Sequence, residues 1–361
     1  MRFRKKIFVL NLLGTNFIGM KNVRRNSVAL FTFYFHSTIF VIFIDNLKLI
    51  LYNEPQVREM LENTNNLNDL NSDEKKSQIN WFPGHMAKTK RELKESIKLV
   101  DLIVEIVDSR IIFSSRNKDF NEICGDKPRL IVLNKTDLVT YEDLNLWTEY
   151  YKKNNINYVL FSTKNNKYIK NFLDKVQEIM HDKLESWKSK HMIGRKIKIM
   201  IIGVPNTGKS AFINRISGNS KAKVENRPGV TRRNQWFTVG HNIEILDTPG
   251  VLAPRFENNT VANNLAFTGA IKDSILDTEE LAFELINKLK ISNINNLISR
   301  YDLEENINEL SSYEILNLIG KNRNILISGG EINISRTAHM ILEEFRSGKL
   351  GKIMLEKPDI N

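Results

Sequence analysis

The sequence has little cysteine: Cys124 is the only one among 361 residues. A single cysteine excludes an intramolecular disulfide and suits a reducing compartment. No catalytic constellation surrounds Cys124, so we interpret it as a small buried residue. No internal repeat is evident either. The hydrophobic content of 41% and the charged content of 26% are typical of globular domains.

Acidic residues are absent from the first 44 positions, which carry seven lysines and arginines. Within them, Ser27 to Ile44 is an uncharged apolar run of 18 residues, at the lower length for a membrane helix. Three interpretations stay open: a signal anchor, an organellar targeting segment, or upstream sequence translated from a wrongly chosen start codon. Residues 53–78 then form a polar, Asn-rich linker. We treat 1–78 as an N-terminal extension that binds a membrane only if the apolar run is a genuine anchor.

The net charge of the chain is +11, and its isoelectric point is near 9.4. The extension contributes +4 of this charge, which leaves +7 for residues 79–361. A basic chain favours a polyanionic partner such as RNA. Asn, Ile and Lys are abundant throughout, and genome composition can enrich the same residues, which weakens the charge argument.

Residues 203–210 read Gly-Val-Pro-Asn-Thr-Gly-Lys-Ser, a phosphate-binding loop of the form G-x-x-x-x-G-K-[ST]. The apolar run Ile197 to Ile202 before it predicts a buried strand, and the residues after it predict a helix. Backbone N–H groups of such a loop surround the phosphates, the lysine reaches the β- and γ-phosphates, and the serine ligates Mg²⁺. The predicted phosphate contacts are Asn206, Thr207, Gly208, Lys209, Ser210 and Ala211.

Asp247-Thr248-Pro249-Gly250 follows an alternating segment that predicts a strand, Ile243 to Leu246. Such a carboxylate holds Mg²⁺ through water, and the N–H of Gly250 can meet the γ-phosphate. Thr231 lies between this motif and the phosphate loop and suits a second protein ligand of Mg²⁺. Ser210, Thr231 and Asp247 are therefore the predicted metal site.

Asn134-Lys135-Thr136-Asp137 follows another strand-like run, Leu130 to Leu133. A carboxylate at Asp137 accepts paired hydrogen bonds from guanine N1 and N2, a pattern that adenine does not offer. Ser162-Thr163-Lys164, after the strand-like Tyr158 to Phe161, is interpreted as a weaker guanine motif. These segments predict that GTP is the nucleotide.

The order of the motifs is reversed, because ordinary small GTPases have the phosphate loop before the guanine motif. The sequence therefore predicts a circularly permuted GTPase domain with a doubly wound, mostly parallel sheet. We place this α/β domain at residues 79–272 and a small all-helical domain at 273–361. Arg91 to Leu99 is predicted as a helix with Lys90, Lys94 and Lys98 on one face, either a solvated face or a contact with rRNA phosphates.

Val251 stands where many GTPases carry a glutamine that orients the attacking water. Valine cannot perform that task, so another group must do so or hydrolysis is slow. Trp81-Phe82-Pro83-Gly84-His85-Met86 supplies a histidine, which can polarise water near neutral pH. The alternative is a packed loop whose histidine only satisfies internal hydrogen bonds.

With these motifs, and with Thr268 to Asp273 and Ser328-Gly329-Gly330, the chain resembles the ribosome biogenesis GTPase A family, which includes mitochondrial relatives. The resemblance covers residues 79–361. It implies that His85 takes part in hydrolysis, and it links Asn206 to the use of K⁺. It also implies a monomeric factor in late assembly of the large ribosomal subunit, with rRNA contact and turnover that rises on the particle.

The expected compartment is the cytoplasm, with mitochondria or a membrane surface as alternatives. Two other functions stay open. One is a membrane-anchored GTPase that uses residues 27–44, and the other is an RNA-binding scaffold that holds nucleotide without turnover.

Overall fold

A computed structural model describes residues 29–35, 38–45, 48–52, 84–192, 194–218, 235–252 and 258–358 of the chain. For 29–35, 38–45, 48–52, 84–90 and Glu305 it describes only the backbone. The chain divides into two compact units, Met1–Ile79 and Asn80–Asn361.

The first unit holds an antiparallel meander of three strands, β1 (Ala29–Phe35), β2 (Thr38–Asp45) and β3 (Lys48–Tyr52). Their aromatic and β-branched residues favour extended structure. Strands therefore lie where the anchor interpretation of Ser27 to Ile44 required a helix, and that part of the interpretation is wrong. Within the described ranges, no helix combines the length and the apolar character needed to cross a membrane.

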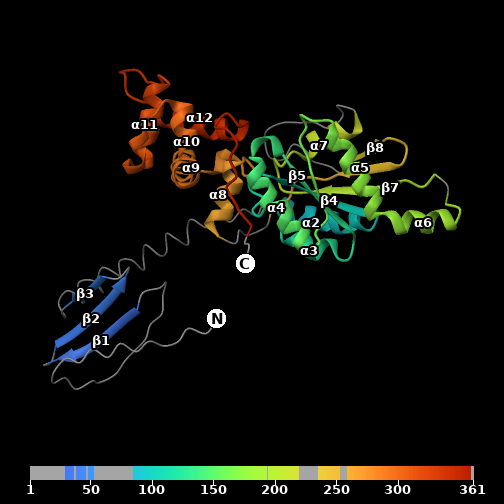
Figure 1. The fold of residues 1–361 in the computed structure, drawn as a ribbon, viewed down its shortest axis with the longest axis horizontal. Helices are drawn as coiled ribbons and strands as arrows, with labels where there is room; N and C mark the ends of the chain where they lie inside the picture. The colour runs from blue at the N-terminus through green and yellow to red at the C-terminus, as the bar shows by residue number, and fades with distance from the viewer. Residues whose placement is uncertain are drawn as a thin grey trace. The chain divides into compact units, whose positions relative to one another are not determined.

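The second unit is built on a six-stranded sheet with the order β6-β5-β4-β7-β9-β8 (Figure 1). All neighbours are parallel except β8 and β9, so the edge strand β8 is the one antiparallel member. The predicted doubly wound, mostly parallel sheet is confirmed. The strands are β4 (Leu102–Asp108), β5 (Arg129–Asn134), β6 (Tyr158–Leu160), β7 (Ile197–Ile202), β8 (Gln235–Val239) and β9 (Ile243–Asp247).

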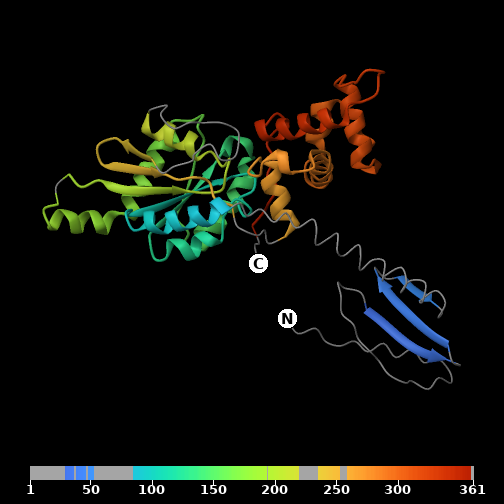
Figure 2. The same ribbon diagram turned by 180° about the vertical axis from the view of Figure 1, so that it is seen from behind.

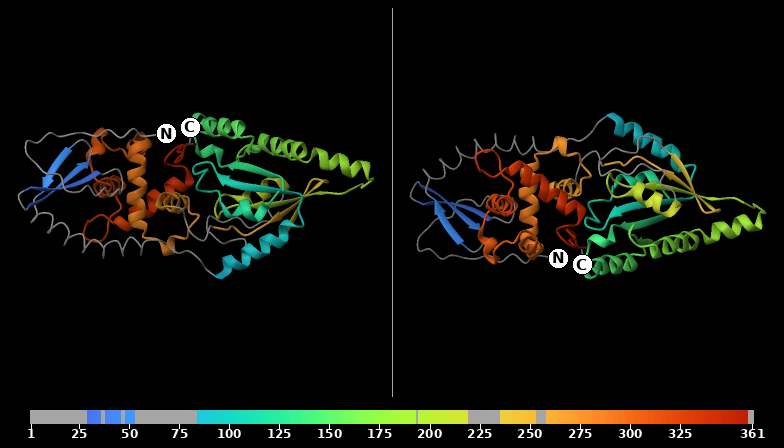
Figure 3. Two further views of the ribbon diagram at one scale, coloured as in Figure 1. Left: turned by 90° about the horizontal axis from the view of Figure 1, so that it is seen from below. Right: turned by 90° about the horizontal axis from the view of Figure 1, so that it is seen from above.

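Helices cover both faces of this sheet, and Figure 3 shows α2 on one side with α5 and α6 on the other. Alternate residues of β4 divide between the faces: Ile103 and Val107 meet the α2, α3 and α4 side, and Val104 meets the other. The helices are α2 (Gly84–Ile97), α3 (Asp119–Cys124), α4 (Tyr141–Lys153), α5 (Lys167–Ile179), α6 (His181–Ser189) and α7 (Lys209–Ser217).

The rest of the unit is helical, as predicted, and packs around one hydrophobic cluster. That cluster also takes in Ile111, Val204 and Leu252 from the loops beside the sheet. Leu265 and Phe267 of α8 belong to it as well, so α8 shares its core with the later helices; the domain boundary after residue 272 stays a prediction. The helices are α8 (Asn259–Phe267), α9 (Thr278–Ser292), α10 (Ile294–Tyr301), α11 (Ser312–Asn322) and α12 (Ile334–Ser347).

The segment after α12 returns to the sheet domain (Figure 1). The N–H of Leu355 donates to the carbonyl of Arg110 at 2.8 Å, and Trp147 Nε1 donates to the carbonyl of Glu356 at 3.1 Å. The carboxylate of Glu356 accepts from the N–H groups of Phe113 and Ser114. These bonds hold the C-terminal segment against α4 and the loop that follows β4.

Candidate nucleotide site

The predicted motifs meet at one edge of the sheet, where β5, β7 and β9 end. Asp108 and Asn134 are paired across β4 and β5, and Ile201 and Asp247 across β7 and β9. The strand order turns back between β4 and β7, because β5 and β6 extend the sheet to one side and β9 and β8 to the other. A crevice at the carboxyl ends beside such a switch point is where doubly wound folds bind their ligands.

The phosphate loop leaves β7 with backbone that only glycine tolerates well. Gly203 has φ 150° and Gly208 has φ 91°, and a Cβ on Gly203 would lie 2.5 Å from the carbonyl oxygen of Ile106. α7 begins directly at Lys209, so its first N–H groups point into the loop. Ser210 and Ala211 lie in that first turn. The loop thus has the form that the sequence predicted.

The side chain of Lys209 lies back inside the loop. Its Nζ donates to the carbonyls of Gly203 at 3.1 Å and Val204 at 2.9 Å, and only 7% of the residue is exposed. Burial lowers the pKa of Lys209 to about 8, although the charge of Asp247 acts in the opposite direction. The lysine is therefore held where a phosphate would arrive, in a setting that disfavours its charge until an anion compensates it.

Asp247 and Gly250 lie against the phosphate loop. Asp247 is 3% exposed, and a Cβ on Gly250 would come within 2.9 Å of Lys209 Nζ and of the backbone of Pro205. The serine hydroxyl and the aspartate carboxylate are hard oxygen donors of the kind that Mg²⁺ prefers, so Ser210 and Asp247 fit the predicted metal. Thr231, the third predicted ligand, lies outside the described residues.

The guanine motif is bonded to the phosphate loop. Asn134 Nδ2 donates to the carbonyl of Thr207 at 2.7 Å, and Lys135 Nζ donates to the carbonyl of Asn206 at 2.6 Å. Thr136 donates to the carbonyl of Phe161, which ties the motif to the weaker guanine segment. The structure therefore brings together loops that are about 70 residues apart in the chain.

Asp137 receives hydrogen bonds from that weaker segment. Ser162 Oγ and Lys164 Nζ each lie 2.7 Å from its carboxylate. Burial alone would raise the pKa of Asp137, but the bonds from Lys164 and Ser162 outweigh it and hold the pKa below its ordinary value. The carboxylate is thus kept charged, as an acceptor for guanine N1 and N2 must be. Thr163 is exposed.

Two residues of this edge were missed in the sequence. They are Asp108, the last residue of β4, and Arg110. The Asp108 carboxylate lies 2.8 Å from Arg110 and 2.9 Å from Lys135. Asp108 is 1% exposed and Arg110 is 2% exposed. Burial alone would raise the pKa of Asp108, but the charges and hydrogen bonds of Arg110 and Lys135 outweigh it, so the pKa lies well below its usual range. The sequence signal that could have identified Asp108 is a carboxylate at the end of an apolar, buried strand.

Arg110 also contacts the helical part. Its Nη1 donates to the carbonyl of Phe345 at 3.0 Å, and its guanidinium lies 5.0 Å from the centre of the Phe345 ring. A second link joins Asn206, whose Nδ2 donates to the carbonyl of Thr268 at 2.6 Å, just after α8. The predicted role of Asn206 with K⁺ stays a prediction.

His85 is the second residue of α2, and only its backbone is described. α2 has 14 residues and is about 21 Å long, and β4, with 7 residues, has nearly the same length. The chain reverses direction between the end of α2 and the start of β4. The start of α2 therefore lies toward the carboxyl edge of the sheet, nearer to the C-terminal helices (Figure 2). Val251 is 5% exposed and packs with Leu93 and Ile97 of this helix.

A family model described as "50S ribosome-binding GTPase" matches residues 198–320, from β7 onward. The ribosome biogenesis GTPase A of Bacillus licheniformis is 40% identical over 281 residues, which are 78% of this chain and 99% of that protein. Mitochondrial ribosome-associated GTPase 1 of Mus musculus is 32% identical and aligns with 77% of this chain and 90% of that protein.

The chain belongs to the ribosome biogenesis GTPase A family. It is a GTP hydrolase, and the expected family resemblance is confirmed. Among solved structures, YlqF from T. maritima bound to GNP is similar, with a TM-score of 0.54 and 25% identity over 75% of this chain and 99% of that one. A GDP-bound YlqF structure has a TM-score of 0.56 at 24% identity. The likeness to that structure concerns the fold.

Proposed function

We propose that this ribosome biogenesis GTPase acts in late maturation of the large ribosomal subunit, and that the precursor particle stimulates its turnover. The ribosomal names of the relatives support the ribosomal role. The direct bonding of the guanine and phosphate loops to each other and to the C-terminal helices supports a turnover that responds to a bound particle. A site linked in this way can exchange information between bound nucleotide and a surface far from it.

Binding is assigned to the residues at the carboxyl edge. Lys209 and the loop N–H groups bind the β- and γ-phosphates, with Gly250 beside them. Asp137 reads guanine N1 and N2, and Asn134 and Lys135 support the ring. Mg²⁺ bound by Ser210, Thr231 and Asp247 would neutralise charge on the phosphates.

Hydrolysis needs a group that orients water, and Val251 packs into the apolar cluster under α2 instead. His85, at the start of the same helix, is the proposed replacement. A shift of the loop that carries Val251 would move α2 as well, because Val251 shares its cluster with Leu93 and Ile97. Particle contact that fixes α2 would then place the histidine and raise the rate.

Nucleotide state is proposed to reach the helical part by two routes. One runs from Lys135 through Asp108 and Arg110 to the end of α12. The other runs from Asn206 to the carbonyl of Thr268. Both begin at groups that touch the phosphate loop, so a loop rearranged on hydrolysis must change their bonds.

The test is phosphate release by the full chain, with and without precursor large subunits, together with sedimentation of the chain on those particles. We expect binding in the presence of a non-hydrolysable GTP analogue and faster turnover on the particle. Equal turnover with and without particles, or binding only to small subunits, would overturn the proposal. Nucleotide binding without any release would favour the scaffold alternative.

A further inference from the structure

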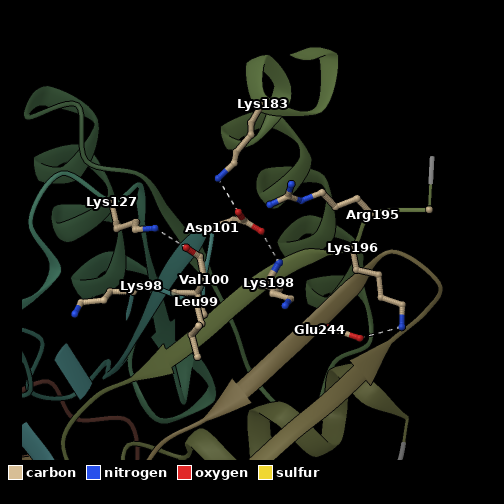
Figure 4. A pocket seen from close by; sticks show the side chains of 11 residues that line it. Lys98, Leu99, Val100, Asp101, Lys127, Lys183, Arg195, Lys196, Lys198 and Glu244 are labelled. Carbon is tan, nitrogen blue, oxygen red and sulfur yellow. Dashed lines mark hydrogen bonds and ion pairs between the residues drawn. The ribbon is translucent and has the colours of Figure 1, made fainter. Parts of the chain in front are cut away.

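A recessed cationic surface lies at the opposite edge of the sheet, where the strands begin (Figure 4). It is a hollow of about 570 Å³ with eleven lining residues, two of them acidic. Strands of this length place it about 20 Å from the nucleotide edge. Its basic lining residues are Lys98, Lys127, Lys183, Arg195, Lys196 and Lys198.

Carboxylates form ion pairs with only some of these six basic residues. Asp101 pairs with Lys183 at 2.6 Å, Glu244 pairs with Lys196 at 3.1 Å, and Lys98 pairs with Glu95 at 3.1 Å. In the part of the chain that the structure describes, Lys127, Arg195 and Lys198 have no carboxylate partner. Lys127 Nζ instead donates to the carbonyl of Val100 at 2.7 Å, which leaves its charge uncompensated.

The carboxylate of Asp101 also bonds the backbone of β7. Asp101 is 7% exposed, and its second oxygen accepts from the N–H of Lys198 at 3.0 Å. This bond, drawn as a dashed line in Figure 4, holds the backbone from which the Lys198 side chain extends. Preorganised cations lose less conformational entropy when they bind an anion.

Two tryptophans accompany the cations. The guanidinium of Arg195 lies 4.4 Å from the centre of the Trp187 ring, and Lys198 Nζ lies 5.6 Å from that of Trp236. Trp187 is 7% exposed and lies beneath the Arg195 guanidinium, whereas Trp236 is 42% exposed. A guanidinium that rests on an indole keeps its N–H edge for a phosphate, and an exposed indole can stack with a base.

The hollow continues into a second one of about 610 Å³, which shares Lys98, Asp101, Lys127 and Lys183 with it. The second also has Asp126 and Asp182 in its lining, so the positive charge concentrates on the side of Arg195 and Lys198. An extended depression with cations along one side, and with the exposed indole of Trp236 next to Lys198, fits a chain of phosphates better than one small anion.

We propose that this cationic patch, defined as Lys127, Arg195, Lys198 and Trp236, binds the phosphodiester backbone of RNA in the precursor particle. The proposal rests on the proposed function, which supplies the particle. It assigns the RNA contact to the edge opposite the nucleotide. The chain can therefore hold RNA and GTP at the same time.

The test compares two full-length variants that lose equal charge. R195Q/K198Q removes two patch cations, and K152Q/K153Q removes two exposed lysines at the end of α4, outside the hollow. The probes are a labelled single-stranded RNA of mixed sequence and purified precursor large subunits. Affinity for each is measured across a salt series, and GTP affinity serves as the control for folding.

We expect R195Q/K198Q to bind RNA about tenfold or more weakly at 0.1 M salt, with a salt slope reduced by about one per residue. GTP affinity and the behaviour of K152Q/K153Q should stay close to those of the unaltered chain. The proposal would be overturned if R195Q/K198Q bound RNA as tightly as the unaltered chain, or if K152Q/K153Q lost as much RNA affinity as R195Q/K198Q. Loss of particle binding with unchanged RNA binding would assign the surface to a protein and would also overturn it. An unaltered chain that ignores the particles would instead refute the proposed function.

Discussion

At the scale of single residues, Asp137 decides which base enters. Asp137→Asn replaces a charged acceptor by an amide that donates toward guanine N2, so GTP affinity should fall by about tenfold or more. Xanthosine triphosphate, which has an oxygen at that position, should now bind. Nucleotide titration of the variant checks this, with the exposed Asp174→Asn on α5 as the control. Unchanged GTP affinity would show that the guanine motif is misassigned.

Lys209 should make nucleotide affinity depend on pH. The pKa of Lys209 in the empty site is about 8. A bound phosphate stabilises the charged lysine and raises this pKa, so nucleotide binding takes up a proton at pH values where the lysine of the empty site is neutral. GDP affinity should be flat below pH 8 and weaken above it, approaching about tenfold per pH unit. Calorimetry at pH 7 to roughly 8.8 in two buffers measures the proton uptake. The Lys209→Met variant is the control, because the guanine ring of GDP titrates in the same way with either protein, whereas the variant has no lysine to take up the proton. Its GDP affinity should lack the dependence on Lys209. A GDP affinity of the unaltered chain that does not change with pH would refute the prediction.

His85 is the proposed water-orienting group. His85→Ala should leave GTP affinity within a few-fold, because Lys209, Ser210 and Asp137 bind the nucleotide. Particle-stimulated turnover should fall by about 10²-fold, the scale of a positioned acid–base group. Intrinsic turnover should change less. His85→Phe keeps the bulk and removes the nitrogens, and stimulated turnover near normal in both variants would assign the task to the particle.

At the scale of elements, Arg110 joins β4 to α12. Arg110→Met leaves Asp108 with Lys135 as its remaining charged partner and removes the donors to α12, so unfolding free energy should fall by about 3 kcal/mol. Arg300→Met breaks a more exposed pair with Glu344 and should cost about 1 kcal/mol or less. Urea denaturation measures both, and equal costs would contradict the buried link.

The elements themselves were largely predictable. Apolar runs of four to six residues before the motifs indicated β5, β6 and β7, because parallel strands are buried on both faces, and an alternating segment indicated β9. The short β8, with an exposed Trp236, carries no such run. α2 begins seven residues before the predicted Arg91, since its first turn has no apolar periodicity that marks a helix.

The links between elements were not predictable. Arg110 and Phe345 are 235 residues apart, and no local pattern connects a guanidinium to a carbonyl at the end of a distant helix. The bonds from Lys135 and Asn134 to the phosphate loop were also invisible, although the motifs themselves implied that the loops are neighbours. Long-range hydrogen bonds depend on the folded arrangement, and a single sequence records only their donors and acceptors.

At the scale of the whole molecule, the boundary between the two compact units falls in the sequence after Ile79, next to the predicted start of the GTPase core at residue 79. A chain that begins at Ser77 should therefore fold, bind GTP with unchanged affinity and sediment with large subunits like the full chain. Thermal unfolding, nucleotide titration and sedimentation of the shortened chain check this. A shortened chain that cannot bind nucleotide would show that residues 1–76 belong to the fold.

The reversed order of the motifs also matters during synthesis. Of the six-stranded sheet, β4, β5 and β6 leave the ribosome first and can pair with one another, but the other side of β4 stays unpaired until β7 emerges. Until residues 203–210 have emerged, the nascent chain has the guanine motif but no phosphate loop, and the site is complete only after Gly250. An unpaired strand edge is a site for aggregation, so the interval before β7 arrives is a vulnerable stage in the life of this chain.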